Sequence, residues 1–489
     1  MKSAGKARSN GLYRHIRTSK EIIRNLLNDL NKNRYKNRIR GLTKRYWVRP
    51  LSQSPLSQQY LTLWRKTMRE RIEYAVKILR PIGRNLLILL KWLTLAVLVG
   101  LVAGGVSTLF AKAMGFVTTF RMENPWLILL LPVGGIIIVT AYRLLHNEND
   151  RGTNLILAEI HKGGDVPSRV APLIIFSTVV SHFFGASVGR EGAALQLGGS
   201  IGSFLGRIIR LDEKDRRVMI MCGMSAAFAA LFGTPMAAAI FAIEVVQVGI
   251  MYYVALVPCI FAALVASNFS ASMGINPEAF IIKDIPEITV LNMGRTVLFA
   301  IICAGVSVIF CMMLHNAGKY FRKYIKNQYL RIIAGSALII LITILLKTDD
   351  YMGAGMNVIE RAIEGEAVPA AFLLKMLLTA LAIGCGFKGG EIVPTFYVGA
   401  TLGCVVGQLI GLPASCAAAV GMIGMFCCVT NCPLASMLIA FELFGYEAAP
   451  FFLVCNAVGY LMSGYYGLYS EQVFIGSKYK FDSEEKKVH

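Results

Sequence analysis

The chain has 489 residues, of which 55% are hydrophobic and only 16% are charged. A soluble domain normally carries about 25% charged residues, so this composition argues against a soluble protein and for a membrane protein. The formal net charge is +21, and most of it lies before residue 90.

Residues 1–84 form a basic N-terminal region, which we expect to be cytoplasmic. A basic segment that directly precedes a first membrane helix follows the positive-inside rule, and such segments also attract anionic lipid headgroups. These two interpretations are favoured over nucleic acid as a partner. No cleavable signal peptide is visible in this region, and residues 1–50 are expected to be largely helical or disordered.

Apolar sequence begins near Asn85 and runs almost to the end of the chain. Stretches such as Leu86–Leu101, Trp126–Tyr142 and Leu338–Leu346 are apolar with few or no charges, and several approach the roughly 20 residues that a membrane-spanning helix needs. The pattern predicts an all-α polytopic membrane protein. We place its transmembrane domain at residues 85–475, followed by a short cytoplasmic tail at 476–489.

The transmembrane domain contains an internal repeat, which divides it into halves at about residues 85–270 and 285–475. Residues 222–245 and 420–443 match at a constant offset, and Gly198, Gly202 and Gly206 match Gly399, Gly403 and Gly407. Duplicated membrane units often pack about a pseudo-two-fold axis with an ion site between them. The small-residue spacing of the glycines itself indicates helix packing.

Charged residues interrupt the apolar sequence at two glycine-rich breaks, Phe183–Gly192 and Gly384–Pro394. They are Arg190, Glu191, Lys388 and Glu391. An ionisable group at membrane depth costs at least about 2.5–3.5 kcal/mol, so it is rare unless it functions. Arg190 and Lys388 are expected to pair with carboxylates.

Glu191 directly precedes a helix that we expect to begin at Gly192–Ala193. A helix start is an anion site, so a carboxylate there can occupy the site and, once protonated, swing away. Glu191 is therefore predicted to be both the gate and a proton carrier. The alternative is a glutamate that only stabilises the helix start.

No enzyme, metal or cofactor pattern is found in the sequence. The eleven cysteines lie mostly in apolar stretches, and the six histidines show no zinc-ligand spacing, with His182 interpreted as a packing residue. A Ser/Lys dyad, an Asp pair and an HExxH motif are absent. A receptor or scaffold role would leave the charges at the breaks unexplained.

Four motifs resemble the CLC chloride channel and chloride/proton exchanger family. They are GREGAALQLGGSIG from Gly189, GFKGGEIVPTFYVGATLG from Gly386, SAAFAALFGTPMAAAIFAIEV from Ser225, and SGYYGLYSEQ from Ser463. The last resembles the segment with the family's pore tyrosine, which maps to Tyr469. The resemblance implies inverted repeats, a homodimer with one pathway per subunit, a multi-pass position in the plasma (inner) membrane, and both termini in the cytoplasm.

The departures from that family are similar to its fluoride/proton antiporter branch. The first filter motif reads Gly152-Thr153-Asn154-Leu155-Ile156, which lacks the usual serine and proline, and Ala193 replaces the proline after GREG. Val245 stands where the exchangers carry an inner proton-transfer glutamate. The second motif carries Lys388 and Glu391, as in the fluoride branch, although Val393 replaces a threonine expected there.

The resemblance implies export of fluoride in exchange for protons, with a chloride/proton exchanger or a passive chloride channel as the alternatives. Because fluoride is strongly hydrated, its site must supply hydrogen-bond donors. Glu391 is a possible second proton site. The predicted anion-binding residues are Thr153, Asn154, Arg190, Gly192, Gly390, Glu391, Ile392 and Tyr469.

Overall fold

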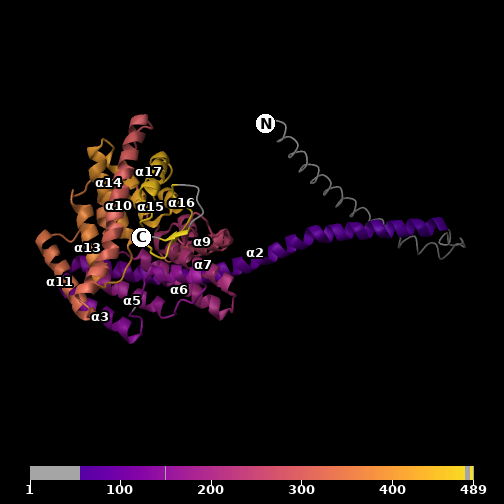
Figure 1. Cartoon of the computed structure of the whole chain (residues 1–489), viewed down its shortest axis with the longest axis horizontal. Coiled ribbons are helices and arrows are strands. Elements are labelled where there is room, and N and C mark those ends of the chain that lie inside the picture. Colours follow the sequence, from indigo (N-terminus) through magenta and orange to yellow (C-terminus); the bar gives the residue numbers. More distant parts are fainter. Residues whose placement is uncertain (1–54, 149, 480–484, 488–489) are drawn as a thin grey trace. The chain divides into compact units, whose positions relative to one another are not determined.

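The computed structural model describes residues 55–148, 150–479 and 485–487. These residues are mostly helical, which confirms the predicted all-α class (Figure 1). The expectations for residues 1–50 lie outside the described residues. The chain divides into two units, Met1–Leu87 and Ile88–His489, and the second contains both repeat halves.

The first half of the second unit is entered by a long helix, α2 (Pro55–Glu123), and continues through short and medium helices. These are η3 (Pro125–Leu130), α3 (Leu131–Leu144), α4 (Thr153–Lys162), α5 (Val170–Phe183), α6 (Glu191–Ile208), α7 (Glu213–Phe232), α8 (Pro235–Glu244), η4 (Tyr253–Ala255) and α9 (Leu256–Ser272).

The second half repeats this succession of helices. Its members are α10 (Val290–Tyr324), α11 (Gln328–Leu346), α12 (Met356–Glu364), α13 (Ala371–Cys385), α14 (Ile392–Leu409), α15 (Ala414–Thr430), α16 (Pro433–Phe444) and α17 (Ala449–Met462). Among the described residues, six helical segments are long and apolar enough to cross a membrane. The polytopic character predicted from the sequence is therefore confirmed.

Matched glycines bring matched helices together in the two halves. A Cβ atom on Gly198 of α6 would collide with the carbonyl oxygen of Gly223 in α7. In the second half, a Cβ on Gly399 of α14 would collide with the carbonyl oxygen of Gly421 in α15. Only glycine allows this approach, so the repeat spacing serves helix packing as predicted.

The two halves are also joined by a reciprocal pair of glutamates. The Glu442 carboxylate, in the last turn of α16, accepts hydrogen bonds from the backbone N–H groups of Met236 and Ala237 at 2.9 and 2.8 Å. The Glu244 carboxylate, at the end of α8, accepts from Leu434 and Ala435 at 3.1 and 2.8 Å. Each glutamate thus caps the first turn of the other helix, where N–H groups lack helical acceptors.

A small sheet lies beyond the helices. Strand β1 (Gln247–Val248) pairs in parallel with β2 (Val473–Ile475), and β2 pairs antiparallel with β3 (Glu485–Lys487). The sheet ties the segment after α8 to the segment after α17. It thereby anchors one end of residues 463–472, which contain Tyr469.

Candidate functional site

The two charged breaks meet face to face. Gly189 and Gly390 form an antiparallel bridge in which each backbone N–H donates to the other's carbonyl at 2.7 Å. A Cβ on Gly390 would collide with the backbone nitrogen of Gly192, so glycine is required there. The starts of α6 and α14 therefore lie side by side, as the repeat predicted.

Helix α6 begins at Glu191, one residue before the expected start, with Arg190 as its N-cap. The Glu191 side chain is 1% exposed, and one oxygen accepts from the backbone N–H of Arg190 at 3.0 Å. The other oxygen accepts from the Arg190 guanidinium at 3.1 Å. The carboxylate thus lies over the positive end of α6, where an anion would bind.

Arg190 is held between two carboxylates. One of its terminal nitrogens donates to Glu278 at 3.0 Å, in addition to the bond with Glu191. The guanidinium therefore pairs with carboxylates, as expected.

The Glu391 carboxylate lies beside the first turn of α6. A Cβ built on Gly192 would lie 3.1 Å from a carboxylate oxygen of Glu391 and 2.9 Å from the Cα of Gly390. Glu391 is the N-cap of α14, so it belongs to the second half but contacts the first. The two glutamates therefore meet at one junction, each at the start of a helix.

The first filter motif forms the beginning of α4 and reaches the same junction. Gly152, its N-cap, has a φ of +62°, which favours glycine. The Thr153 hydroxyl donates to the carbonyl of Gly192 at 3.3 Å, and the Asn154 side-chain oxygen accepts from the backbone N–H of Glu471 at 3.1 Å. The Asn154 amide NH₂ remains as a donor.

Tyr469 is 2% exposed, and its hydroxyl has no hydrogen-bond partner among the described residues. Its segment is held by the fully buried Gln472, whose amide donates to the carbonyls of Val245 and Thr430 at 3.0 and 2.9 Å. The carbonyl of Val245, the residue that replaces the inner glutamate, thus helps to hold the Tyr469 segment in place.

The predicted hydrogen-bond donors differ in whether the protein itself already uses their protons. The Thr153 proton and the Gly390 N–H are used by carbonyl oxygens. The N–H groups of Gly192 and Ile392 lie in first turns, where no helical acceptor exists, and no other acceptor is found within the described ranges. These two N–H groups, Asn154 and Tyr469 are among the donors left for an anion.

Asp150 belongs to the same region, although the sequence patterns did not indicate it. Its side chain is 2% exposed, and one oxygen accepts from the Lys388 ammonium at 2.8 Å. The other oxygen accepts from the backbone N–H of Gly152 at 3.3 Å. This pair confirms that Lys388 binds a carboxylate, and it joins the second break to the first filter motif. The only signal was an acidic residue two positions before Gly152.

The histidines and cysteines of the described residues form no metal-binding group. No cluster of three or more His, Cys, Asp or Glu side chains in this part of the chain is placed to hold a metal ion. All eleven cysteines are buried and free. His182 is buried, and its Nδ1 contacts the carbonyl of Thr178 in its own helix at 3.0 Å, in agreement with a packing role.

Comparison with known proteins gives a family. Residues 134–464 match the model of the voltage-gated chloride channel family. This protein belongs to that family, the CLC family. The chain is 40% identical over 389 residues to a chloride/fluoride channel protein of Pseudomonas syringae pv. tomato, covering 78% of this chain and 86% of the relative. It is 24% identical over 383 residues to the H(+)/Cl(−) exchange transporter ClcA of Vibrio cholerae, covering 72% and 81%.

Solved CLC structures agree with the fold. A CLC-type fluoride/proton antiporter superposes with a TM-score of 0.76 at 34% identity, covering 79% of this chain and 98% of that one. A slow cyanobacterial Cl−/H+ antiporter superposes with a TM-score of 0.66 at 20% identity, covering 76% and 94%. The CLC fold expected from the four motifs is confirmed.

Proposed function

We propose that this CLC protein is a secondary transporter that exports fluoride in exchange for protons. The observation that carries the proposal is the junction at which Glu191 and Glu391 meet over the starts of α6 and α14. The proposed anion site and the two proposed proton sites therefore lie at the same junction. The names of two similar proteins, a chloride/fluoride channel protein and a fluoride/proton antiporter, support the anion class.

The exchange follows from competition for the start of α6. The Glu191 carboxylate occupies the position that an anion would take, because N–H groups and the helix dipole favour negative charge there. Protonation removes this attraction, so the side chain leaves and the anion enters. Return of the carboxylate requires loss of the proton and expels the anion. One proton site thus gates one anion site.

Glu391 is the second proton site in this proposal. Its carboxylate lies against Gly192, close to the place where Glu191 accepts or loses a proton. With Val245 at the usual inner position, the chain has no carboxylate there. Glu391 therefore replaces it as the group that passes protons to and from Glu191.

Fluoride is favoured over chloride by the donors that remain. A small, strongly hydrated anion must exchange its water shell for hydrogen bonds, and charge-assisted bonds are the strongest. Asn154, Tyr469 and the N–H groups of Gly192 and Ile392 supply such donors. A protonated Glu191 or Glu391 adds another. Chloride needs fewer donors, so chloride transport is the alternative function.

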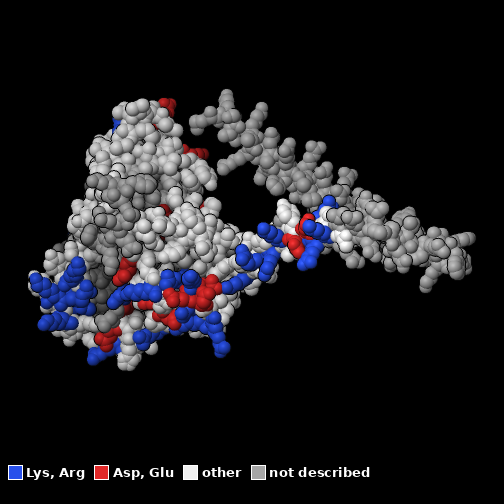
Figure 2. All heavy atoms as spheres, turned by 45° about the vertical axis from the view of Figure 1, so that its right-hand side comes forward, with Lys and Arg blue, Asp and Glu red and all other residues white. Residues whose placement is uncertain are grey.

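We further propose a homodimer in the plasma (inner) membrane, with both termini in the cytoplasm and one anion pathway per subunit. Residues 207–217, from the end of α6 into α7, carry five basic residues, and Lys91 of α2 pairs with Asp215 in the first turn of α7. In Figure 2, Lys and Arg gather with Asp and Glu at one end of the helical body. Above them lies a wide band almost without charge, so the charged residues mark one side of the protein. The positive-inside rule assigns this side to the cytoplasm.

The test is ion flux from liposomes. The purified full-length protein is reconstituted with fluoride or chloride inside, and anion efflux is recorded together with proton movement. The proposal predicts faster fluoride than chloride efflux, coupled to proton influx. Chloride efflux as fast as fluoride efflux would contradict the anion assignment, and anion efflux without proton movement would indicate a channel.

A further inference from the structure

The part of α2 that leads into the first membrane span has an exposed apolar stripe. Trp64, Met68, Leu79, Ile82 and Leu86 recur at steps of three, four and eleven residues, which places them on one face of a helix. Trp64, Leu79 and Ile82 are 58%, 63% and 58% exposed. Large apolar side chains are therefore left uncovered along this face.

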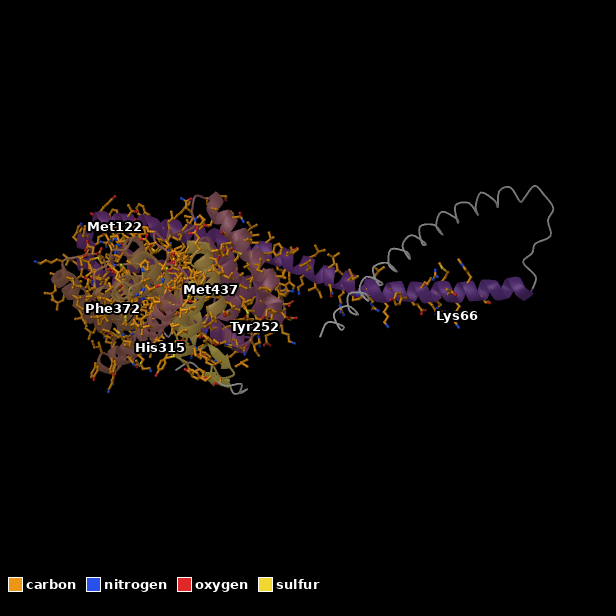
Figure 3. The ribbon with its side chains drawn as sticks, turned by 90° about the horizontal axis from the view of Figure 1, so that it is seen from above. Lys66, Met122, Tyr252, His315, Phe372 and Met437 are labelled. Carbon is orange, nitrogen blue, oxygen red and sulfur yellow. The ribbon has the colours of Figure 1, made fainter. Side chains whose placement is uncertain are left out.

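The opposite face of the same segment is basic. Lys66, Arg69, Lys77, Arg80 and Arg84 follow helical spacing, and all are exposed. Between residues 64 and 86 the sequence has seven Lys and Arg residues against two Glu residues. In Figure 3 the side chains around the labelled Lys66 project freely from α2. An exposed apolar stripe beside a basic face is the pattern of helices that lie on membranes.

The segment is covalently held near a bilayer. Helix α2 is continuous from Pro55 to Glu123, and its apolar span is entered directly after Arg84. Pro81 lies inside the helix, where it removes one backbone hydrogen bond and allows a bend. A bend at Pro81 lets the turns from Trp64 to Arg80 follow the membrane surface, while the turns that carry Ile82 and Leu86 enter the bilayer.

We infer that residues 64–80 form a surface helix that binds the anionic phospholipids of the bilayer in which the protein resides. The stripe enters the interface between headgroups and acyl chains, and the basic face binds anionic headgroups. This inference does not depend on which anion is transported.

The alternative partner for the apolar stripe is the same helix of a second copy of the protein. A two-stranded coiled coil requires apolar residues every 3.5 residues along each helix. One heptad register has an apolar seam, because it combines Met68, Ala75 and Ile82 with Ile72, Leu79 and Leu86. Pairing in that register would bring together two segments that each carry seven Lys and Arg residues against two Glu residues, so their like charges repel. An anionic lipid surface attracts the same basic residues, and it is therefore the better occupant.

The experiment places one spin label on each face of the full-length protein. Because all eleven native cysteines are buried, Met68→Cys and Lys66→Cys give selective labelling of the stripe and of the basic face. Each variant is reconstituted in phosphatidylcholine alone and in a mixture with phosphatidylglycerol. Collision of the label with oxygen, which is lipid-soluble, and with a water-soluble nickel chelate is then measured.

The expected result is a severalfold rise in the ratio of oxygen to nickel collisions at Met68→Cys in the mixture, with little change at Lys66→Cys. Replacing Lys77, Arg80 and Arg84 by Gln in the Met68→Cys background should remove this rise. Equal exposure to water of both labels in both lipids would overturn the inference. Strong dipolar broadening between Met68→Cys labels would overturn it in favour of a second copy.

Fluoride flux measured on the same vesicles keeps the two proposals apart. An active transporter whose labels show no lipid dependence would contradict only the surface helix. The expected collision pattern in vesicles without proton-coupled fluoride flux would contradict only the proposed transport function.

Discussion

Helices α4 and α12 occupy corresponding places in the two halves, and each begins with a Gly-x-Asn sequence. Both N-cap glycines have positive φ, +62° at Gly152 and +82° at Gly355. The start of α4 contacts Gly192 and, through Asp150, Lys388 of the other half. It is therefore part of the junction that holds the two glutamates.

The start of α12 packs against Tyr397 and Lys375 of its own half, and the preceding Gly353 lies beside Arg121 of α2. A Cβ on Gly355 would lie 2.6 Å from the ring of Tyr397. The fully buried Lys375 ammonium lies 5.0 Å from the centre of that ring and donates to the carbonyls of Gly353 and Tyr351 at 2.7 and 3.2 Å. An aromatic ring and a lysine thus pack against this helix start.

The contacts that the two halves share hold the fold together, whereas the proposed site depends on residues that the two halves do not share. The glycine contacts and the reciprocal glutamate caps are equivalent in both halves. The carboxylates are not, because Glu191 has Ile392 at its matched position, and Glu391 has Arg190. We therefore expect changes at symmetric features to alter stability and changes at asymmetric features to alter transport.

The largest effect is expected for Glu191→Gln, which keeps the shape of the side chain but cannot carry a proton. Proton flux in liposomes should fall to background, because in the proposed mechanism the Glu191 carboxyl is the group that exchanges with the anion at the start of α6. Glu278→Gln, which removes the other partner of Arg190, is the matched control and should keep proton coupling. Unchanged proton flux in Glu191→Gln would remove this residue from the mechanism.

Glu391→Gln should slow proton-coupled fluoride flux by about 100-fold, since a positioned proton donor or acceptor contributes about that much or more. Fluoride binding, measured by calorimetry, should be retained because the backbone donors remain. A variant with normal proton flux would show that protons reach Glu191 by another route.

Asp150→Asn and Lys388→Met should each weaken fluoride binding by about 10-fold, because each leaves one charge of a largely buried pair without its partner. The double variant should bind more tightly than either single variant, since no unpaired charge remains. Isothermal titration of all three proteins measures this coupling. Additive losses would mean that the pair does not position the filter segments as one unit.

Lys375→Met tests the start of α12, which is the second-half counterpart of the start of α4. Loss of its bonds to two buried carbonyls should lower the free energy of unfolding by about 2 kcal/mol. Fluoride flux per folded protein should stay within twofold of the wild-type value. A change in anion selectivity would show instead that the start of α12 belongs to the pathway.

The smallest effects are expected for the symmetric caps. Glu244→Gln and Glu442→Gln should each lower stability by about 1 kcal/mol, the usual cost of a lost helix cap. The two thermal shifts should be similar, with proton coupling intact in both. A loss of coupling in Glu244→Gln alone would show that this residue takes over the role missing at Val245.

Sequence patterns predicted the repeat and both breaks, because these depend on spacing along the chain. The expectation that Glu191 works with Glu391 came from the repeat together with the family resemblance. Asp150 was missed because its partner Lys388 lies 238 residues away, in a contact that no local pattern encodes. The start of α6 was expected one residue late, since Arg190 rather than Glu191 takes the N-cap position.

Uphill proton movement driven by a fluoride gradient tests the proposed exchange without any change to the protein. Liposomes that contain the wild-type chain are loaded with fluoride and diluted into fluoride-free buffer at equal pH, and internal pH is followed. Exchange through the junction of Glu191 and Glu391 predicts internal acidification, which Glu191→Gln abolishes. Collapse of the fluoride gradient without any pH change would contradict coupling at this site.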